Sequence, residues 1–155
     1  MNAERQVKNM KLVETIVIAT DGSDRNRAAV DEGLKIARAC GSQVWAIYVI
    51  DTSVFAPVQY GSAMAGPGNT EVNRELDDEA QQVVGRIRDL AGELQVGMVI
   101  REGKPAAEII RFAAENKAGL IVIGSRGKGG LERLLLGSVA DEVVRTAPCS
   151  VLVVK

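Results

Sequence analysis

Histidine is missing from this chain of 155 residues. Its absence excludes Ser-His-Asp hydrolases, Cys-His proteases and metal sites that use imidazole ligands. Any chemistry must therefore depend on carboxylates, lysine, arginine, hydroxyls, backbone amides or a metal that arrives with a ligand.

Aromatic residues and excess charge are also scarce. The chain has one tryptophan, two tyrosines, two phenylalanines and a net charge of −1. Proteins that bind nucleic acids usually present a basic surface, and many stack bases on aromatic rings. The composition therefore disfavours a nucleic-acid partner. Cys40 and Cys149 lie in apolar patterns without CxxC spacing, which predicts buried thiols and not a redox pair.

Long apolar runs are absent. No stretch approaches the roughly eighteen uninterrupted apolar residues of a membrane span, and residues 1–11 lack the apolar run of a secretory signal. We expect no membrane partner, a cytoplasmic location, a polar N-terminal tail over residues 1–11 and a single domain over residues 12–155.

Apolar segments alternate with helical periodicity along the rest of the chain. Continuous apolar segments predict strands at residues 15–20, 43–50, 94–101, 119–123 and 150–154. Apolar residues at helical spacing predict intervening helices near residues 29–37, 72–90, 109–113 and 139–146. This order predicts a single doubly wound α/β domain, in which a five-stranded parallel sheet carries helices on both faces.

Residues 51–69 contain prolines and glycines without a sustained period. Structureless loops of this length are uncommon in small domains, and many have a function. We predict a mobile flap here, beside the ligand site predicted below.

The densest special chemistry lies at residues 124–138, directly after the predicted strand 119–123. Glycines allow backbone amides to approach an anion, and a helix that begins near Ser138 adds free amides and the positive end of its dipole. The segment is suited to holding phosphate. It matches neither the Walker A pattern nor GxGxxG, so neither mechanism applies.

The spacing of these glycines resembles that of a known family. Gly124, Gly127 and Gly137-Ser138 match the pattern G-x2-G-x9-G-[ST] of nucleotide-binding universal stress proteins. Further similarity appears in ATDGS at residues 19–23, in YVID at residues 48–51 and in the C-terminal segment GLERLLLGSVADEVVRTAPCSVLVV.

The resemblance implies an adenine nucleotide alpha hydrolase-like fold with strand order 3-2-1-4-5. It implies ATP, ADP or AMP across the carboxyl ends of the strands, with Mg²⁺ or Mn²⁺ on the phosphates. Asp21 would contact the nucleoside, and Val49 would contact adenine through its backbone. Gly127, Ser138 and Val139 would hold phosphates.

Four further positions complete the implied site: Ala19, Ile123, Gly124 and Arg126. Relatives often carry proline or valine where this chain has Ala19. A separate rule agrees with the placement, because ligands of open α/β sheets bind where the strand order reverses. In the implied order, Asp21 and Gly124 follow the two strands at that point.

Several readings remain open. The chain can be an ATP-binding regulatory module of the stress response, a slow metal-dependent ATPase, or a nucleotide-free interaction protein of the same fold. No catalytic base is evident, so any hydrolysis is expected to be weak. A purely structural role is the alternative for each of these residues. Asp21 would open a turn, Gly137-Ser138 would cap a helix, and Arg126 and Lys128 would be solvated charges.

The final predicted strand, residues 150–154, carries no charge before Lys155. In the implied order it lies at a sheet edge, and uncovered apolar edges pair with other chains. We expect a homodimer in which Val151–Val154 pair about a twofold axis, as similar proteins commonly do.

Overall fold

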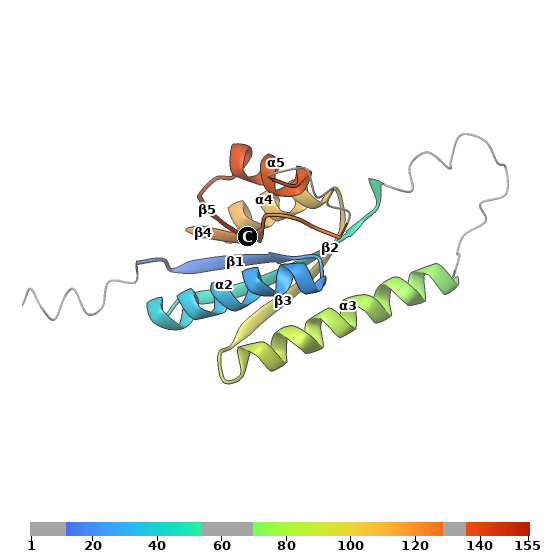
Figure 1. The fold of residues 1–155 in the computed structure, drawn as a ribbon, viewed down its shortest axis with the longest axis horizontal. Helices are drawn as coiled ribbons and strands as arrows, with labels where there is room; N and C mark the ends of the chain where they lie inside the picture. The colour runs from blue at the N-terminus through green and yellow to red at the C-terminus, as the bar shows by residue number, and fades with distance from the viewer. Residues whose placement is uncertain (1–11, 54–69, 129–135) are drawn as a thin grey trace, which may run out of the picture.

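A parallel β-sheet forms the centre of the protein, with helices on both of its faces (Figure 1). The computed structural model describes residues 12–53, 70–128 and 136–155. In chain order the elements are β1 (Thr15–Thr20), the 3-10 helix η1 (Asp24–Asn26), α2 (Arg27–Cys40), β2 (Gln43–Asp51), α3 (Thr70–Ala91), β3 (Val96–Gly103), α4 (Pro105–Glu115), β4 (Leu120–Gly124), α5 (Ser138–Thr146) and β5 (Ser150–Val154).

The strand order is β3-β2-β1-β4-β5, and every pair is parallel. β1 pairs with β2 on one side and β4 on the other, so that Ala19 lies opposite both Ile47 and Ile123. The chain moves outward from β1 to β3 and then returns to continue from β4. The predicted doubly wound fold and its order are confirmed, and the order reverses between β1 and β4.

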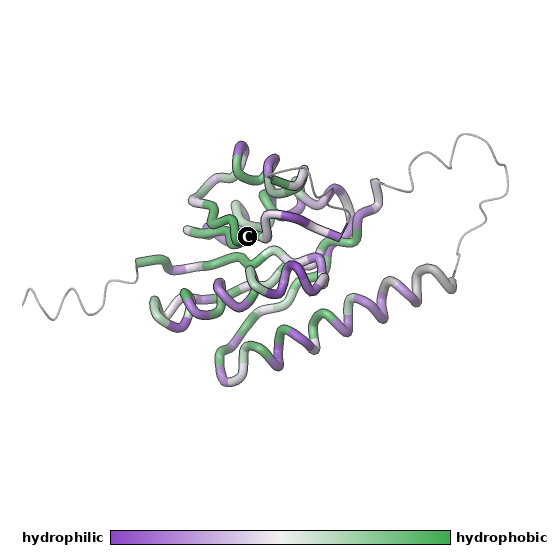
Figure 2. Tube along the Cα trace, viewed as in Figure 1, coloured by the Kyte–Doolittle hydropathy of each residue, from purple (hydrophilic) through white to green (hydrophobic). Residues whose placement is uncertain are grey.

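Alternate side chains of each strand enter two separate cores. Ile16 and Ile18 pack in a cluster with α2 and α3, whereas Val17 and Ala19 pack in a cluster with α4 and α5. Because both faces are covered, the central strands read as unbroken apolar runs. Figure 2 shows the resulting contrast between these strands and α3, along which hydrophobic and hydrophilic residues alternate.

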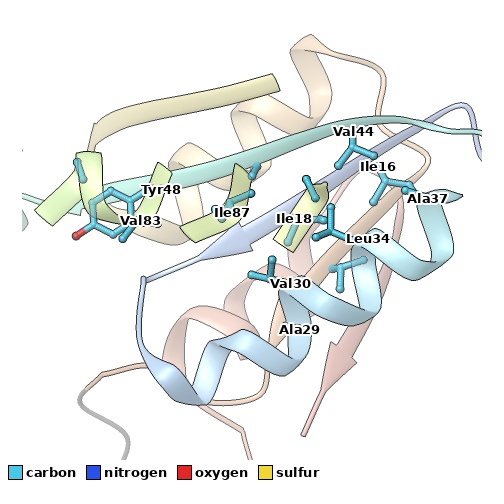
Figure 3. Packing of buried hydrophobic residues seen from close by; sticks show 14 of the residues in the cluster. Ile16, Ile18, Ala29, Val30, Leu34, Ala37, Val44, Tyr48, Val83 and Ile87 are labelled. Carbon is cyan, nitrogen blue, oxygen red and sulfur yellow. The ribbon is translucent and has the colours of Figure 1, made fainter. Parts of the chain in front are cut away.

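The cluster beneath α2 and α3 brings the helices close to the sheet (Figure 3). A Cβ on Gly33 of α2 would lie 2.7 Å from the Ile18 side chain, so only glycine permits this approach. Val83 and Ile87 of α3 are buried on the same face. The two helices are thereby fixed beside the carboxyl end of β1.

One predicted strand is displaced. β3 runs from Val96 to Gly103, two residues later than predicted, because α3 ends in a turn in which the Leu94 amide bonds the Ala91 carbonyl. Gly92, with φ +58°, provides the left-handed conformation of that turn. Leu94 is apolar because it packs against the cluster beneath α2 and α3, and not because it belongs to the strand.

The remaining boundaries lie within two residues of the predicted ones where a glycine or proline marks the end of an element. α2 ends at Cys40, just before Gly41, and α4 begins at Pro105. Asp51, predicted to open the loop, is the last residue of β2. The predicted tail at residues 1–11 and residues 54–69 of the predicted flap lie outside the described residues.

The two cysteines are free thiols, but both are half-buried and not buried as predicted. Packing raises the pKa of the Cys149 thiol chiefly by removing water from it. In the part of the chain that the structure describes, none of the helices combines the length and apolar character needed to cross a bilayer.

Candidate functional site

The carboxyl ends of three neighbouring strands meet at one edge of the sheet. β1 ends at Thr20 and β4 at Gly124, and the two strands are hydrogen-bonded neighbours. On the other side of β1, Thr20 lies opposite Tyr48 of β2, which places Val49 one residue beyond the end of β1. The segments that follow β1 and β4 therefore start side by side.

The segment after β1 is a tight turn built on Asp21. Its Oδ1 accepts hydrogen bonds from the Ser23 amide at 3.0 Å and from the Ser23 hydroxyl at 2.7 Å. Gly22 has φ +74°, and its amide donates to the Thr20 hydroxyl at 3.1 Å. Asp21 thus opens a turn, as its residue type allows.

The other oxygen of Asp21 reaches the glycine segment. The Lys128 amide donates to Oδ2 at 2.8 Å across 107 residues of sequence. A Cβ on Gly127 would lie 3.1 Å from the same oxygen. One carboxylate therefore orders its own turn and also anchors the segment after β4, so Asp21 does more than open a local turn.

The glycine segment is pinned at both ends. The Gly137 amide donates to the Ser125 carbonyl at 2.7 Å, and the Ser125 amide donates to the Val154 carbonyl at 2.7 Å. A Cβ on Gly137 would lie 3.3 Å from that Ser125 oxygen. Residues 129–135 lie outside the described residues. These contacts bring the start and the end of the segment together.

The end of the segment runs into the N-terminus of α5. Gly137, with extended backbone, precedes the helix, and Ser138 is its exposed first residue. The first amides of any helix have no partner within the helix, and the dipole places partial positive charge there. The amides of Ser138 and Val139 are therefore suited to an anion.

Two of the predicted contact residues are in the core. Ala19 is 3% exposed and Ile123 is 4% exposed, and both pack beneath α4 and α5. A ligand can meet them only through the backbone or the last atoms of the side chain. Val49 is half-buried against the same cluster, and Arg126 is exposed at the surface.

Asn26 is a site residue that the sequence interpretation missed. It is 4% exposed, and its Nδ2 lies 2.7 Å from where a Cβ on Gly124 would stand. Its Oδ1 has no hydrogen-bond partner among the residues that the structure describes. Asn26 lies three, four and seven residues before the buried Ala29, Val30 and Gly33 of α2, so the helical spacing could have indicated that it is buried too.

Helix α3 holds the Asp21 turn from the side. The Arg86 guanidinium donates to the Gly22 carbonyl at 3.2 Å, and a Cβ on Gly22 would collide with Val83 at 2.4 Å. Tyr48 lies 3.8 Å from the same position. Burial, and then the charge of Asp21, raise the pKa of the Tyr48 phenol above its ordinary value of 10.0, so the phenol stays neutral at pH 7.

A cleft of about 320 Å³ lies between α2 and α3 beside this turn. It is lined by the β1 turn and the two helices, through Thr20, Gly22, Ser23, Asp24, Arg27, Val30, Val83, Arg86, Ile87, Asp89 and Leu90. The lining combines buried apolar side chains, such as Val30, Val83 and Ile87, with charges of both signs. None of the described residues of the glycine segment lines this cleft.

The described residues contain no group of three or more acidic or cysteine side chains arranged to hold a metal ion. A divalent ion at this edge of the sheet would therefore depend on ligands other than such a cluster of described side chains.

Comparison with known proteins identifies the family. The model of the universal stress protein family matches residues 13–155. The chain belongs to this family. A universal stress protein of Methanocaldococcus jannaschii is 42% identical over 147 residues, which cover 93% of this chain and 83% of that protein.

Solved structures of universal stress proteins share the fold. The UspA protein of Lactobacillus plantarum has a TM-score of 0.73 at 29% identity, covering 92% of this chain and 97% of its own. A universal stress protein in complex with cAMP has a TM-score of 0.63 at 27% identity, covering 92% and 96%. One from Archaeoglobus fulgidus in complex with dAMP has a TM-score of 0.59 at 25% identity, covering 94% and 100%.

Proposed function

We propose that this universal stress protein binds an adenine nucleotide, with ATP as the main ligand and ADP or AMP as alternatives, and that it acts as a nucleotide-dependent regulatory module in the stress response. The nucleotide would lie across the carboxyl ends of β1 and β4. Related proteins crystallised with cAMP and dAMP support the choice of an adenine ligand.

The observation that carries this proposal is the meeting of Asp21 with the pinned glycine segment. Two separate stretches of chain meet through the bond from the Lys128 amide to Asp21, at the point where the strand order reverses. There a side chain on Gly127 would press against Asp21, and the segment leads into the free amides at the start of α5.

Each predicted residue then has a physical task. Amides at Gly127, Ser138 and Val139 would bind phosphate oxygens, and the exposed Arg126 would add charge. Asp21 already accepts three hydrogen bonds, two at Oδ1 and one at Oδ2. Because a carboxylate can accept about four, roughly one position on Oδ2 remains for a ribose hydroxyl. The backbones of Ala19, Val49, Ile123 and Gly124 would form the wall toward the nucleoside.

We propose that the metal ion is bound by the nucleotide and not by a dedicated protein site. Mg²⁺ or Mn²⁺ would arrive on the phosphates, since the described residues offer no cluster to hold it. Its charge would screen the phosphates from one another. We also propose a cytoplasmic location, since ATP is a cytoplasmic ligand, and a homodimer through β5.

Titration calorimetry tests nucleotide binding. Mg-ATP should bind with a dissociation constant in the micromolar range or tighter, which corresponds to roughly −8 kcal/mol. Adenosine should bind more weakly, because it offers the amides of the glycine segment no anion. The absence of both heat and a thermal shift at millimolar Mg-ATP would contradict the proposal and favour a nucleotide-free interaction protein.

A further inference from the structure

The backbone of Lys128 lies next to the carboxyl end of β1. Its backbone amide is held by Asp21 Oδ2 at 2.8 Å, immediately after the glycine whose Cβ would touch the same oxygen. The origin of the side chain is therefore fixed relative to the Asp21 turn.

From this origin the side chain extends to β2 and α3. The Lys128 ammonium is ion-paired with Glu79 of α3, and it lies 5.9 Å from the centroid of the Tyr48 ring, at the limit for a cation–π contact. The side chain thus extends from the end of β1 toward Tyr48 of β2 and Glu79 of α3, beside the point where the nucleotide is proposed to bind.

The ion pair that holds it there is weak enough to exchange. The Lys128 side chain is 49% exposed and the Glu79 side chain 41% exposed. Exposed pairs contribute little to stability, because water screens the charges and both side chains lose rotamer freedom. A phosphate group carries more charge than one carboxylate and offers several acceptor oxygens to the ammonium.

Building on the nucleotide site proposed above, we propose that Glu79 is a specificity-determining residue: it competes with the ligand's phosphates for the Lys128 ammonium. Binding of a phosphorylated nucleotide moves the ammonium from Glu79 to the phosphates and releases this contact with α3. Adenosine gives Lys128 no new partner and leaves the pair intact. Glu79 therefore lowers the affinity for nucleotides that carry phosphate groups and does not change the affinity for adenosine.

A charge-removing variant tests the competition. Glu79→Gln should tighten Mg-ATP about two- to fivefold in titration calorimetry, the range expected for an exposed pair, and should leave adenosine unchanged. In a Lys128→Gln background, Glu79→Gln should have no effect on ATP. Glu75→Gln, at an exposed position one turn earlier on α3, removes the same charge from the same helix and should change ATP affinity less.

The competition would be overturned by equal tightening in Glu75→Gln, by equal tightening for adenosine, or by the same gain from Glu79→Gln when Lys128 is replaced by glutamine. Unchanged ATP affinity in Glu79→Gln would also overturn the competition. If the parent protein still binds ATP in that case, the proposed nucleotide site is not contradicted. If the parent protein binds neither ATP nor adenosine, the proposed function fails and this inference fails with it. Thermal unfolding of each variant shows that the fold is intact.

Discussion

Gly127 and Gly85 lie in contrasting environments. A Cβ on Gly127 would lie 3.1 Å from Asp21 Oδ2, whereas a Cβ on Gly85 of α3 would meet nothing within 4 Å. The first glycine allows the backbone to approach Asp21 closely. The second sits in an open helix position where alanine is the better residue.

Gly127→Val should therefore weaken Mg-ATP binding by about tenfold or more, since the new side chain displaces Asp21 and shields amides that would bind phosphate. Adenosine affinity should fall much less, because the nucleoside does not use those amides. Calorimetric titrations of both ligands measure the difference. Equal losses for the two ligands would mean that the segment had misfolded, and no loss would place the phosphates elsewhere.

Gly85→Ala is the matched control. It should raise the melting temperature by roughly 2–4 °C, because a glycine in an open helix interior costs about 1 kcal/mol relative to alanine. ATP affinity should not change. A melting temperature that falls would show that position 85 has contacts that the structure does not contain.

The packing of α4 against β3 is fixed by a cluster of charged side chains. Arg101 of β3 bonds Glu115 at 2.5 Å and Glu108 at 3.5 Å, and its guanidinium lies 5.0 Å from the centroid of the Phe112 ring. The hydrogen bond from Arg101, and secondarily the charges of Arg101 and Arg111, hold the pKa of Glu115 below its ordinary value of 4.5. This element-level contact should respond to pH.

A carboxylate whose pKa is lower in the folded state stabilises the fold above its ordinary pKa, and this contribution is lost as the pH falls through the folded value. Glu115→Gln should therefore lower the melting temperature slightly at pH 7, and the difference from the parent should shrink as the pH drops below 4.5. Glu93→Gln, at an exposed position in the turn after α3, is the control. A difference that grew in acid would contradict the assigned role.

The sequence predicted a helix or strand correctly where a single local pattern, such as an apolar run or a terminal glycine, determined it. β1 and β4 are unbroken apolar runs because both faces of the sheet are covered, and α2 stops at Gly41. β3 was placed two residues early because Leu94 is apolar for a different reason: it packs under α3 from a turn. Periodicity alone cannot distinguish these two uses of leucine.

The meeting of the two segments was predictable to the same extent. Asp21 and Gly124 follow the strands at which the order reverses, which predicts that their segments lie side by side, and the Lys128 amide does bond Asp21. The partner of the Lys128 ammonium was not predictable. Glu79 lies on α3, and its position depends on how that helix packs on β2, which no spacing in the sequence specifies.

At the scale of the whole molecule, the two sheet edges differ. Among the described strands, β5 pairs with β4 alone, and its residues Val151–Val154 remain partly exposed although all are apolar. The opposite edge, β3, carries Arg101 and Glu102 and one exposed apolar residue, Ile100. Charged residues protect an edge from pairing, whereas an apolar edge invites it.

A dimer through β5 should therefore give about twice the mass of one chain in light scattering at tens of micromolar. Val153→Lys should convert it to monomer or aggregate, because paired strands would bring two charges together about the twofold axis. Ile100→Lys, the same substitution type at the β3 edge, should leave the mass unchanged. A parent protein with the mass of a single chain would contradict the interface.

The central claim is that an adenine nucleotide binds where the glycine segment meets the Asp21 turn. Backbone amide NMR during titration with Mg-ATP tests it most directly, because each amide reports its own surroundings. We expect the largest shifts at Gly127, Lys128, Ser138 and Val139, next to the phosphates. Shifts confined to residues that line the cleft between α2 and α3, such as Leu90, or no shifts at saturating ATP, would contradict it.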